Sequence, residues 1–569
     1  MNLTTLNKVF FITFAVYMLI GMHYFQHNFG GSGLHLPFNV ISWMFISVLI
    51  GIGLWQATLQ AKLVYSGLSL MFIAATLIML IPVLYADPMV AGLSYARLFG
   101  LVGGLLFFIA LQQLQLNQRQ RLILLYLILG AVFIEAVFSF VQYYLLPVDN
   151  TAYYQLNTNR PSGIFQQPNV SASFLVTGIV LALYLLTQTK LDEKRRRLFC
   201  YATTFMAVIP VVLLQSRTGY LSLFIAPLIM LPWVWLKLKK TAQSKSLLIW
   251  LMCYAIAFSV GAYSLETAEV VVRSADAIVD PGARVPIYLH SLHMWLEKPV
   301  LGWGYGSFEV AYLNSYSEAL SQGLALPGSP ENLTHPHNEL LYWGIEGGLI
   351  ALGGIALLVI GFLGIIVKQP VSQALALLGL VFPLVLHSQT EFPFYHAAVH
   401  WIILLTLVWY VASRYGKTKS IKLNYTLLIV TLAFLIPLVT TLFMITTLHA
   451  SKLLTQYERS DRSDISILKP IVNPVAWITR LEFNTMMYRL NIAMYNHDIA
   501  ELNNYINWAA QFSQKTPRAT VYVHWIRALA KLGKIAEAKA LLHQATRLYP
   551  RSTSIQKFAA SQASASQFE

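Results

Sequence analysis

The sequence is poor in charged residues and in cysteine, and both shortages narrow what the chain can be. Asp, Glu, Lys and Arg make up 11% of the 569 residues, whereas hydrophobic residues make up 57%. This balance is typical of a chain that crosses a membrane many times, with a smaller soluble part attached. The two cysteines, Cys200 and Cys253, both lie inside apolar stretches. They therefore indicate neither a disulfide framework nor a thiolate metal site.

Acidic residues are scarcer than basic ones, with 24 Asp and Glu against 39 Lys and Arg, so the formal net charge is +15. In a soluble protein this excess would suggest a nucleic-acid partner. Here most of the excess lies in short segments between apolar stretches and in a mildly basic tail. We attribute the charge to membrane topology and expect no nucleic-acid partner.

Thirteen apolar stretches are each long enough to cross a bilayer as a helix. They lie at about residues 8–27, 39–58, 66–85, 93–113, 121–145, 170–188, 198–215, 218–236, 246–264, 339–366, 371–389, 396–413 and 424–448. No small-residue cleavage pattern closes the first stretch, which follows Lys8. We interpret it as an uncleaved signal anchor.

Basic residues fall almost entirely on alternate connections between these spans. The basic connections contain Lys8, Lys62, Arg119, Arg121, residues 194–197, Lys237, Lys239, Lys240, Lys245, Lys368, Arg414, Lys417, Lys419 and Lys422. The other connections, before the tail, contain Arg160, Arg217, Arg273, Arg284 and Lys298, with Arg97 near the mouth of the fourth span. The positive-inside rule places the basic set in the cytoplasm. We therefore expect a cytoplasmic N-terminus and, after residue 448, a tail outside the cytoplasm.

This pattern predicts an all-α polytopic membrane protein with about 13 transmembrane helices. A long outer loop, residues 265–338, has helical patterning from Val285 to Leu296 and several Gly-rich turns. Because structureless loops of this length are uncommon, we expect it to pack as a functional element. We predict two domains, a transmembrane catalytic domain at 1–448 and a helical tail at 449–569.

The tail has the pattern of paired helices from about residue 484. The clearest pair runs from Val521 to Leu532 and from Ile535 to Leu548, with Gly533 between them. Alanines along both helices allow close approach, which resembles a tetratricopeptide-like repeat. A degenerate earlier copy covers 486–517. We predict a small helical module for protein contacts.

Polar residues collect in the connections that topology places on the outer face. The segments are Asn159-Arg160-Pro161-Ser162-Gly163-Ile164-Phe165-Gln166-Gln167-Pro168-Asn169, Gln215-Ser216-Arg217-Thr218-Gly219, Arg284, His335-Pro336-His337-Asn338-Glu339, and Glu391 to His396. They are distant in sequence but share one predicted face of the membrane. We therefore treat them as one candidate site.

Arg217 has two readings. A single Arg in a short outer turn is commonly an anchor for lipid headgroups. However, this turn is too short for the side chain to reach far, and a guanidinium suits bidentate contact with phosphate. Both readings stay open on these residues alone.

His335 and His337 are two residues apart, so they share a face of an extended segment. Together with Glu339 they can bind a metal, although no third histidine or cysteine lies at the usual spacing. They can also cap the following span. We favour proton transfer, because imidazole titrates near neutral pH.

The other polar residues also have structural alternatives. Gln166 and Gln167 can simply end a loop, and Asn169 can cap the sixth span. Glu135 lies within the fifth span, where a carboxyl is costly to bury and must be neutral or paired. The sequence assigns no chemical role to Glu135.

Several of these motifs, in this order, resemble the O-antigen ligase and Wzy superfamily. They are Ser216-Arg217-Thr218-Gly219-Tyr220, the stretch with Arg284, Trp295, Pro299 and Gly302-Trp303-Gly304, and His335-x-His337-Asn338-Glu339-Leu340-Leu341. The segment from Asn159 to Asn169 and the helical tail resemble PglL-type bacterial protein O-oligosaccharyltransferases in particular.

The resemblance implies transfer of a glycan en bloc from undecaprenyl pyrophosphate to Ser or Thr hydroxyls of a periplasmic or pilin-like protein. It implies catalytic roles for Arg217 and Arg284, which stabilise the leaving pyrophosphate, and for His337, which acts as the base. No cofactor or metal is expected. Residues assigned to substrate binding are Gln166, Gln167, Asn169, Arg160, His335, Asn338 and Tyr395. The implied partners are the lipid-linked oligosaccharide, the acceptor protein and membrane lipid, and the implied location is the bacterial inner membrane, with the site and tail in the periplasm.

Two other classes remain as alternatives. An O-antigen ligase or polymerase would use the same donor with a sugar acceptor. A transporter would also have many spans, but transporters usually place polar groups near the midplane and in repeated halves. Here the polar groups gather at one face and no internal repeat is visible, which argues against transport.

Overall fold

A computed structural model describes residues 3–147, 160–188, 193–267, 282, 284–324 and 333–564. Thirteen helices among these residues are long and apolar enough to cross a membrane, which confirms the predicted number and the multi-pass class. They are α1 (Leu3–Leu19), α2 (Pro37–Leu59), α3 (Gly67–Leu80), α5 (Tyr95–Gln113), α6 (Gln118–Tyr144), α7 (Pro168–Leu185), α8 (Glu193–Leu213), α9 (Arg217–Lys240), α10 (Ser244–Glu266), α14 (Glu339–Ile366), α15 (Val371–Ser388), α17 (Ala398–Tyr415) and α18 (Thr426–Arg459). The chain forms two compact units, each taken from three chain segments.

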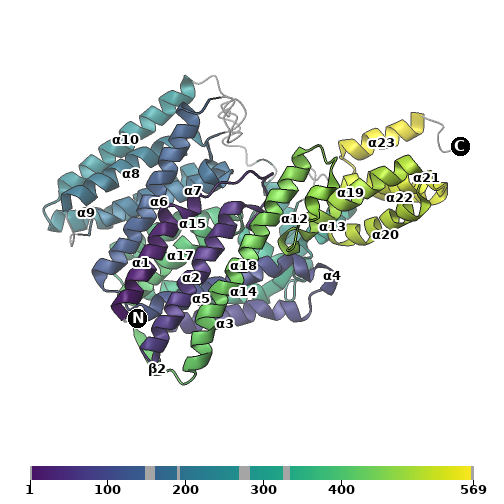
Figure 1. Cartoon of the computed structure of the whole chain (residues 1–569). Helices are drawn as coiled ribbons and strands as arrows, with labels where there is room; N and C mark the ends of the chain where they lie inside the picture. Colours follow the sequence, from purple (N-terminus) through teal and green to yellow (C-terminus); the bar gives the residue numbers. More distant parts are fainter. Residues whose placement is uncertain are drawn as a thin grey trace. The chain divides into compact units, whose positions relative to one another are not determined.

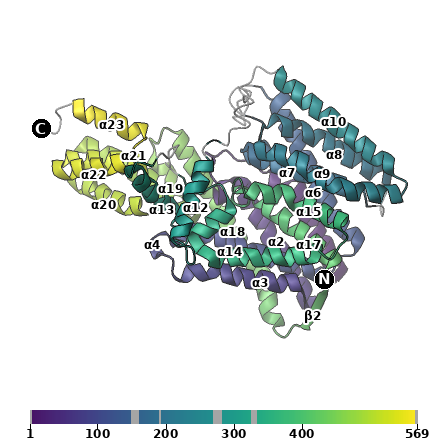
Figure 2. The same cartoon turned by 180° about the vertical axis from the view of Figure 1, so that it is seen from behind.

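Short helices extend or connect these spans. They are η1 (Gly21–His23), η2 (Gly33–His35), η3 (Ile81–Leu84), α4 (Pro88–Ala91), η4 (Gly92–Ser94), η5 (Gly163–Phe165) and α16 (Pro393–His396). The first compact unit contains residues 1–76, 99–280 and 355–452, and the second contains 77–98, 281–354 and 453–569. Helices α8, α9 and α10 of the first unit lie side by side (Figure 1), and Figure 2 shows the same grouping from behind.

The chain is almost entirely helical, as predicted, and the described residues also contain two short strands that pair. Strand β1 (Lys62–Ser66) runs antiparallel to β2 (Thr418–Lys422), with Lys62 opposite Lys422. Each strand has five residues and follows or precedes a span, so in the sequence it is indistinguishable from a basic connecting loop. The partner lies more than 350 residues away, and nothing in either segment identifies it.

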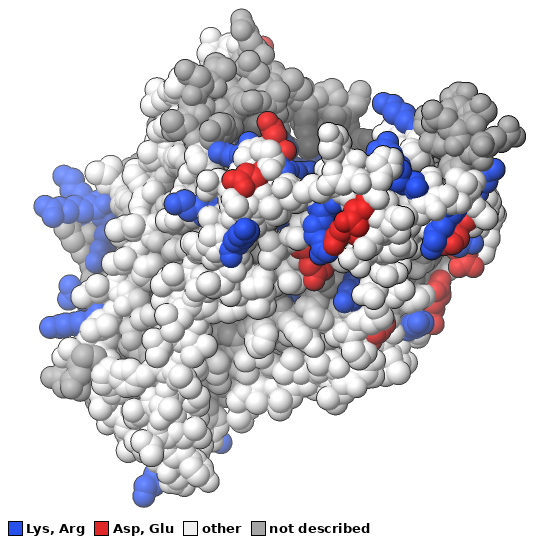
Figure 3. Space-filling view, turned by 45° about the vertical axis from the view of Figure 1, so that its right-hand side comes forward, with Lys and Arg blue, Asp and Glu red and all other residues white. Residues whose placement is uncertain are grey.

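Contacts within the first unit sort the connections into two groups. In one group β1 pairs with β2, Arg121 donates to the Ser413 carbonyl at 2.7 Å, and Arg414 donates to Gln188 at 3.1 Å. These are connections that carry the basic residues. In the other group Asn39 donates to the His396 carbonyl at 2.8 Å, and Arg160 donates to the Leu214 carbonyl at 2.7 Å. The grouping agrees with the predicted alternation of charge. Figure 3 shows a broad area of one face without charged residues.

Helix α7 is the most enclosed of the candidate spans, with 89% of its membrane-length window buried, against 11% for α18. It packs against α6, α8, α9 and α15. Small side chains permit this close packing: a Cβ added at Gly178 would lie 2.2 Å from a methyl of Val132. Because α7 is held on several sides, the polar residues at its start have a fixed position.

The second unit contains the long loop and the tail. Besides η3, α4, η4 and the start of α14, its helices are α12 (Arg284–Glu297), α13 (Phe308–Ser321), η6 (Ile465–Leu468), η7 (Val475–Trp477), α19 (Ile478–Asn496), α20 (Ile499–Lys515), α21 (Ala519–Lys531), α22 (Ile535–Leu548) and α23 (Thr553–Ser564). Consecutive tail helices from α19 to α22 pack against one another, and the bounds of α21 and α22 match the two predicted helices to within two residues. Helix α18 runs through the domain boundary predicted at residue 448.

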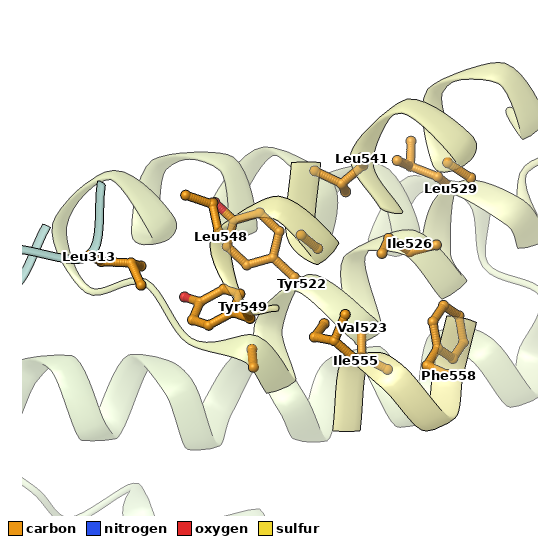
Figure 4. Close-up of a cluster of buried hydrophobic side chains, with 13 residues drawn as sticks. Leu313, Tyr522, Val523, Ile526, Leu529, Leu541, Leu548, Tyr549, Ile555 and Phe558 are labelled. Carbon is orange, nitrogen blue, oxygen red and sulfur yellow. The ribbon is translucent and has the colours of Figure 1, made fainter. Parts of the chain in front are cut away.

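Helix α13 of the loop packs against the tail. Leu313 lies in the same buried cluster as Tyr522, Leu548 and Tyr549 of the tail, as Figure 4 shows. At one end of α13 Glu309 forms an ion pair with Arg518. Toward the other end the Ser317 hydroxyl donates to the Arg547 carbonyl at 2.8 Å. The loop and the tail therefore share one hydrophobic core within this unit.

The Gly-rich motif at 302–306 fixes the backbone of this unit. The Trp303 N–H donates to the Ile345 carbonyl at 2.7 Å, and the Gly304 N–H donates to the Glu346 carbonyl at 2.9 Å. Gly302 has φ +73°, and a Cβ there would lie 2.7 Å from Glu346 backbone atoms, so only glycine fits. The Glu346 side chain pairs with buried Arg97, which also stacks against aromatic rings. This motif therefore has a structural role.

Candidate functional site

The turn that carries Arg217 is closely braced. Arg217 is the first residue of α9, and the Ser216 side chain caps the helix by accepting the Gly219 N–H at 3.1 Å. Arg160 donates to the carbonyls of Leu214, at 2.7 Å, and Gln215, at 3.2 Å. A helix start favours anions, and half-buried Arg217 adds a cation there. Arg160 thus positions the turn through its carbonyls.

A chain of side-chain hydrogen bonds joins three segments at this turn. The Ser216 hydroxyl donates to Asn169 Oδ1 at 2.7 Å, and Asn169 Nδ2 donates to Glu391 Oε1 at 3.2 Å. The hydroxyls of Thr218 and Thr390 are 2.9 Å apart. Ser216 and Glu391 are buried. The structure therefore brings together three of the predicted polar segments.

The alternative that Asn169 caps α7 was wrong. The residue at that cap is Gln167, which has an extended backbone and whose carbonyl accepts the Ser171 N–H at 3.1 Å. Asn169 lies in the first turn, and its side chain makes the bonds to Ser216 and Glu391 instead.

The two neighbouring glutamines differ in conformation. Gln166 is exposed and left-handed, with φ +59°, whereas Gln167 is half-buried and extended, with φ −137°. A non-glycine residue in the left-handed region is uncommon and often marks a functional position. Of the pair, Gln166 is the one presented to the surroundings.

Tyr395 lies in a segment held by Asn39, a residue that the sequence analysis did not single out. Asn39 Nδ2 donates to the carbonyls of His396, at 2.8 Å, and Tyr395, at 3.4 Å, and its Oδ1 accepts the Ala398 N–H at 2.8 Å. Its side chain is buried near the start of α2. A polar residue at the start of an apolar span is the signal that could have identified it.

In the second unit, α12 contacts the segment that carries His337. The Tyr288 hydroxyl donates to the His337 carbonyl at 2.8 Å. Arg284 is half-buried one helical turn before Tyr288, so the two side chains share a face of α12. The structure thus places Arg284 and His337 in the same neighbourhood, as the candidate site requires. Tyr288 was missed because a tyrosine in a helical pattern carries no distinctive signal.

The backbone of His337 is held in an uncommon conformation by His335. His337 has φ +57°, and its N–H donates to His335 Nδ1 at 2.7 Å. The His335 ring is buried and meets the Tyr342 ring edge-on at 4.6 Å. His335 therefore positions its neighbour, while His337 is half-buried.

Asn338 and Glu339, the next two polar residues, lie at the start of α14. Asn338 Oδ1 accepts the Leu341 N–H at 3.0 Å, which is a helix-capping bond. Glu339 is buried in the first turn, where a carboxylate is favoured by the helix dipole. Among the described residues, no three His, Cys, Asp or Glu side chains group as a metal site would require.

His290, on the same helix as Arg284, is kept neutral by its surroundings. Burial and the neighbouring His293 lower the pKa of His290 to about 4. Its ring meets the Tyr312 ring edge-on, with 5.0 Å between centroids. His290 thus belongs to the packing between α12 and α13.

The predicted site residues therefore fall into two groups, one in each compact unit. The first group contains Arg160, Gln166, Gln167, Asn169, Arg217 and Tyr395, and the second contains Arg284, His335, His337 and Asn338. Each group combines a half-buried arginine with polar residues at a helix start. Such an arrangement can bind an anion and, where His337 lies, move a proton.

Three family models match successive parts of the chain. "Protein glycosylation ligase" matches residues 161–186, "O-Antigen ligase" matches 202–356, and "Virulence factor membrane-bound polymerase, C-terminal" matches 375–564. The chain is also 24% identical over 300 residues to a "General O-oligosaccharyltransferase" of Acinetobacter baylyi. That match covers 49% of this chain and 49% of the relative, so it spans about half of the relative's length. The resemblance to PglL-type O-oligosaccharyltransferases is confirmed.

Proposed function

From the family segments that this chain carries in order, we propose that it is a protein O-oligosaccharyltransferase. It transfers a glycan en bloc from undecaprenyl pyrophosphate to Ser or Thr hydroxyls of periplasmic or pilin-like proteins. One observation carries the proposal: the bonds among Asn169, Ser216 and Glu391 join all three matched family segments. Residues from the three separately matched segments are thus linked directly.

The chemistry requires stabilisation of a departing pyrophosphate. Arg217 and Arg284 supply the positive charge, and the start of α9 adds backbone N–H groups at Arg217. Cations placed where charge develops stabilise the transition state more than the ground state. Because the arginines supply this charge, the reaction needs no metal ion.

His337 accepts the proton of the acceptor hydroxyl as that oxygen attacks the anomeric carbon. His335 and Tyr288 hold its backbone on both sides, through the N–H and the carbonyl. The hydroxyl oxygen forms the new bond, the glycosidic oxygen leaves with the pyrophosphate, and the configuration inverts. Gln166 and Tyr395 contact donor or acceptor.

The charge alternation supports the proposed orientation in the membrane, and the family resemblance supports the proposed location. The chain lies in the bacterial inner membrane with its N-terminus in the cytoplasm. The long loop, the polar connections and the tail lie in the periplasm, where lipid-linked glycan and exported acceptors meet. The basic connections joined by β1 and β2 lie in the cytoplasm.

Reconstitution tests the proposal. Purified enzyme is mixed with lipid-linked glycan and a Ser-containing acceptor protein, with and without EDTA, and the acceptor is analysed by mass spectrometry. We expect a glycan adduct on Ser or Thr that persists with EDTA. The proposal fails if wild-type enzyme leaves the protein unmodified while it glycosylates lipid A core sugar.

A sugar acceptor is the second candidate, because the "O-Antigen ligase" model matches residues 202–356 and the polymerase model matches residues 375–564. Such an enzyme would extend or transfer glycan to saccharide. The same reaction with a saccharide acceptor separates the two functions. Transfer to protein alone supports the first, and transfer to saccharide alone supports the second.

A further inference from the structure

Glu135 lies in the middle of α6, and the candidate site as described so far does not use it. Its side chain is fully buried. Glu135 Oε1 accepts the Ile164 N–H at 2.9 Å, and Oε2 lies 3.4 Å from Nδ1 of His23. The carboxylate is therefore bonded to η5, the short turn at Gly163–Phe165 that leads to Gln166.

Gln142, two turns later on α6, holds the same turn. Gln142 Oε1 accepts the N–H groups of Ser162, at 3.1 Å, and Gly163, at 2.7 Å. Its Nε2 donates to the Gly163 carbonyl at 3.1 Å. Residues 135 and 142 lie on one face of the helix, so α6 presents two polar groups to a single turn.

The turn is fitted closely to the carboxylate. Gly163 has φ +58°, and a Cβ there would lie 1.6 Å from Glu135 Oε1, which no side chain allows. After Gly163, Phe165 is fully buried and meets the rings of Phe38 and Phe174 at 5.8 and 5.1 Å. The backbone is thus bonded at 162–164 and packed at 165.

Gln166 follows directly and turns outward, exposed and left-handed. Gln166 lies between this turn, which is bonded to α6, and the start of α7 at Pro168. If packing alone were needed at position 135, an apolar residue would fill the space without the cost of burying a carboxyl in an apolar span. A bonded carboxyl at this place indicates a role in holding the turn.

We propose that Glu135 is a positioning residue that fixes Gln166 through the Gly163–Phe165 turn, with Gln142 as its partner. That Gln166 contacts substrate rests on the proposed function. That Glu135 fixes the position of Gln166 does not depend on it. Glu135 does not touch the substrate. It acts by keeping the Ile164 N–H bonded, so that the next exposed side chain points in one direction.

The first test measures position without activity. Cys200 and Cys253 are replaced by Ala, Gln166→Cys is introduced, and alkylation by a maleimide is timed in detergent. We expect the labelling rate to shift in Glu135→Leu, which lacks an acceptor, and to stay near the parent value in Glu135→Gln, which keeps one. Tyr495→Cys, at an 87% exposed residue of the tail, is the control and should not change.

Gln142→Leu removes the bonds from Gln142 to Ser162 and Gly163 and leaves Glu135 unchanged. This variant replaces Glu135→Leu in the test if Glu135→Leu does not fold. It should shift the labelling of Gln166→Cys in the same way. An unchanged labelling rate in folded protein from either Leu variant overturns the proposal.

The second test uses transfer activity. Glu135→Leu should lower transfer about tenfold or more, since a buried N–H left without an acceptor releases the turn, and Glu135→Gln should recover most of it. The double variant with Gln166→Ala should be no worse than Gln166→Ala alone. Losses that multiply contradict positioning through Gln166. If Gln166→Ala transfers normally, the substrate role of Gln166 fails, while the labelling result still decides the positioning.

Discussion

Gln166, Gln215 and His337 each adopt a left-handed backbone conformation that non-glycine residues rarely adopt. They are three of the nine described non-glycine residues with positive φ, and all three lie in the polar segments of the candidate site. Two of them are held by side chains whose bonds go to backbone atoms: Arg160 for Gln215 and His335 for His337. Strain that neighbours maintain at such positions is typical of functional sites.

His337 is predicted to be the base, so His337→Ala should lower transfer by roughly 10²–10⁴-fold while donor binding persists. A base contributes to the transition state and little to ground-state affinity. Transfer rate and donor affinity are measured separately on purified enzyme. His335→Ala is the matched control and should be milder, because the base remains although its backbone is less well held. Substantial activity in His337→Ala would contradict the assignment.

Arg217→Lys keeps the charge and loses the planar fork, so it separates phosphate binding from lipid anchoring. We expect transfer to fall by roughly 10–100-fold with normal membrane insertion, as the loss of one charge-assisted hydrogen bond predicts. Steady-state transfer and protein yield in membranes are the measurements. Wild-type turnover in Arg217→Lys would return this residue to the role of headgroup anchor.

The lowered pKa of His290 predicts a pH-dependent stability. The folded protein disfavours protonated His290, so the unfolded chain, with a pKa of about 6.5, binds more protons between the two values. The stabilisation is complete above about pH 6.5 and declines as the pH falls toward 4. Thermal unfolding of wild type and His290→Leu is compared from pH 7.5 to 4.5. As the pH falls, the midpoint temperature of unfolding should decrease more for the wild type than for His290→Leu. Equal decreases in the two proteins would refute this prediction.

The residue types of the site could be read from the sequence, but their bonds could not. Arginine is a residue type that commonly binds phosphate. The described hydrogen bonds of Arg160, however, go to the backbone carbonyls of Leu214 and Gln215, which are 54 and 55 residues away in the sequence. Asn338 was assigned to substrate binding, and its described bond caps α14. A hydrogen-bond partner depends on how distant segments meet, and one sequence does not contain that information.

Among the elements, the starts of α7, α9 and α14 carry most of the polar residues of the two groups. Their caps differ: Ser216 caps α9 with its side chain and Asn338 caps α14, whereas Gln167 makes no side-chain cap. The spans themselves were predictable, because apolar length and charge alternation are local properties. The strands β1 and β2 were not, because their pairing is not local.

The ion pair between Glu309 of α13 and Arg518 at the start of α21 predicts energetic coupling between loop and tail. Burial raises the pKa of Glu309, although Arg518 lowers it, so removing the arginine leaves a carboxyl that is costly to charge. Arg518→Ala should therefore destabilise the fold more than the double variant with Glu309→Ala does, with a coupling of about 1 kcal/mol or more. Chemical unfolding of the four proteins measures it. Additive effects would show that the pair is not coupled.

The contacts between α13 and the tail also affect how a truncated chain would behave. A deletion from about residue 484 removes Tyr522, Leu548 and Tyr549, which cover Leu313. If that deletion changed which acceptor is used, the change could come from the missing tail or from the loop that the tail no longer covers. Point variants at the interface separate the two effects.

At the scale of the whole chain, the topology rests on two independent observations. The charge alternation assigns the connections to two sides, and the hydrogen bonds of the first unit join connections within each side. Reporter fusions test the compartments. A periplasmic reporter after residue 450 should be active and one within 190–197 inactive, because the second lies in a basic connection. The reverse pattern would invert every assignment that depends on the shared face.

The contact between α13 and the tail also sets an order in time. Ser317 and its partner Arg547 are separated by 230 residues. At roughly 5–20 residues per second, a ribosome needs roughly 10–50 s to reach the second after the first. During that interval Leu313 lacks the tail residues that cover it in the finished fold, while four further spans are being inserted. Synthesis therefore completes the packing around α13 only after the last span and most of the tail have been made.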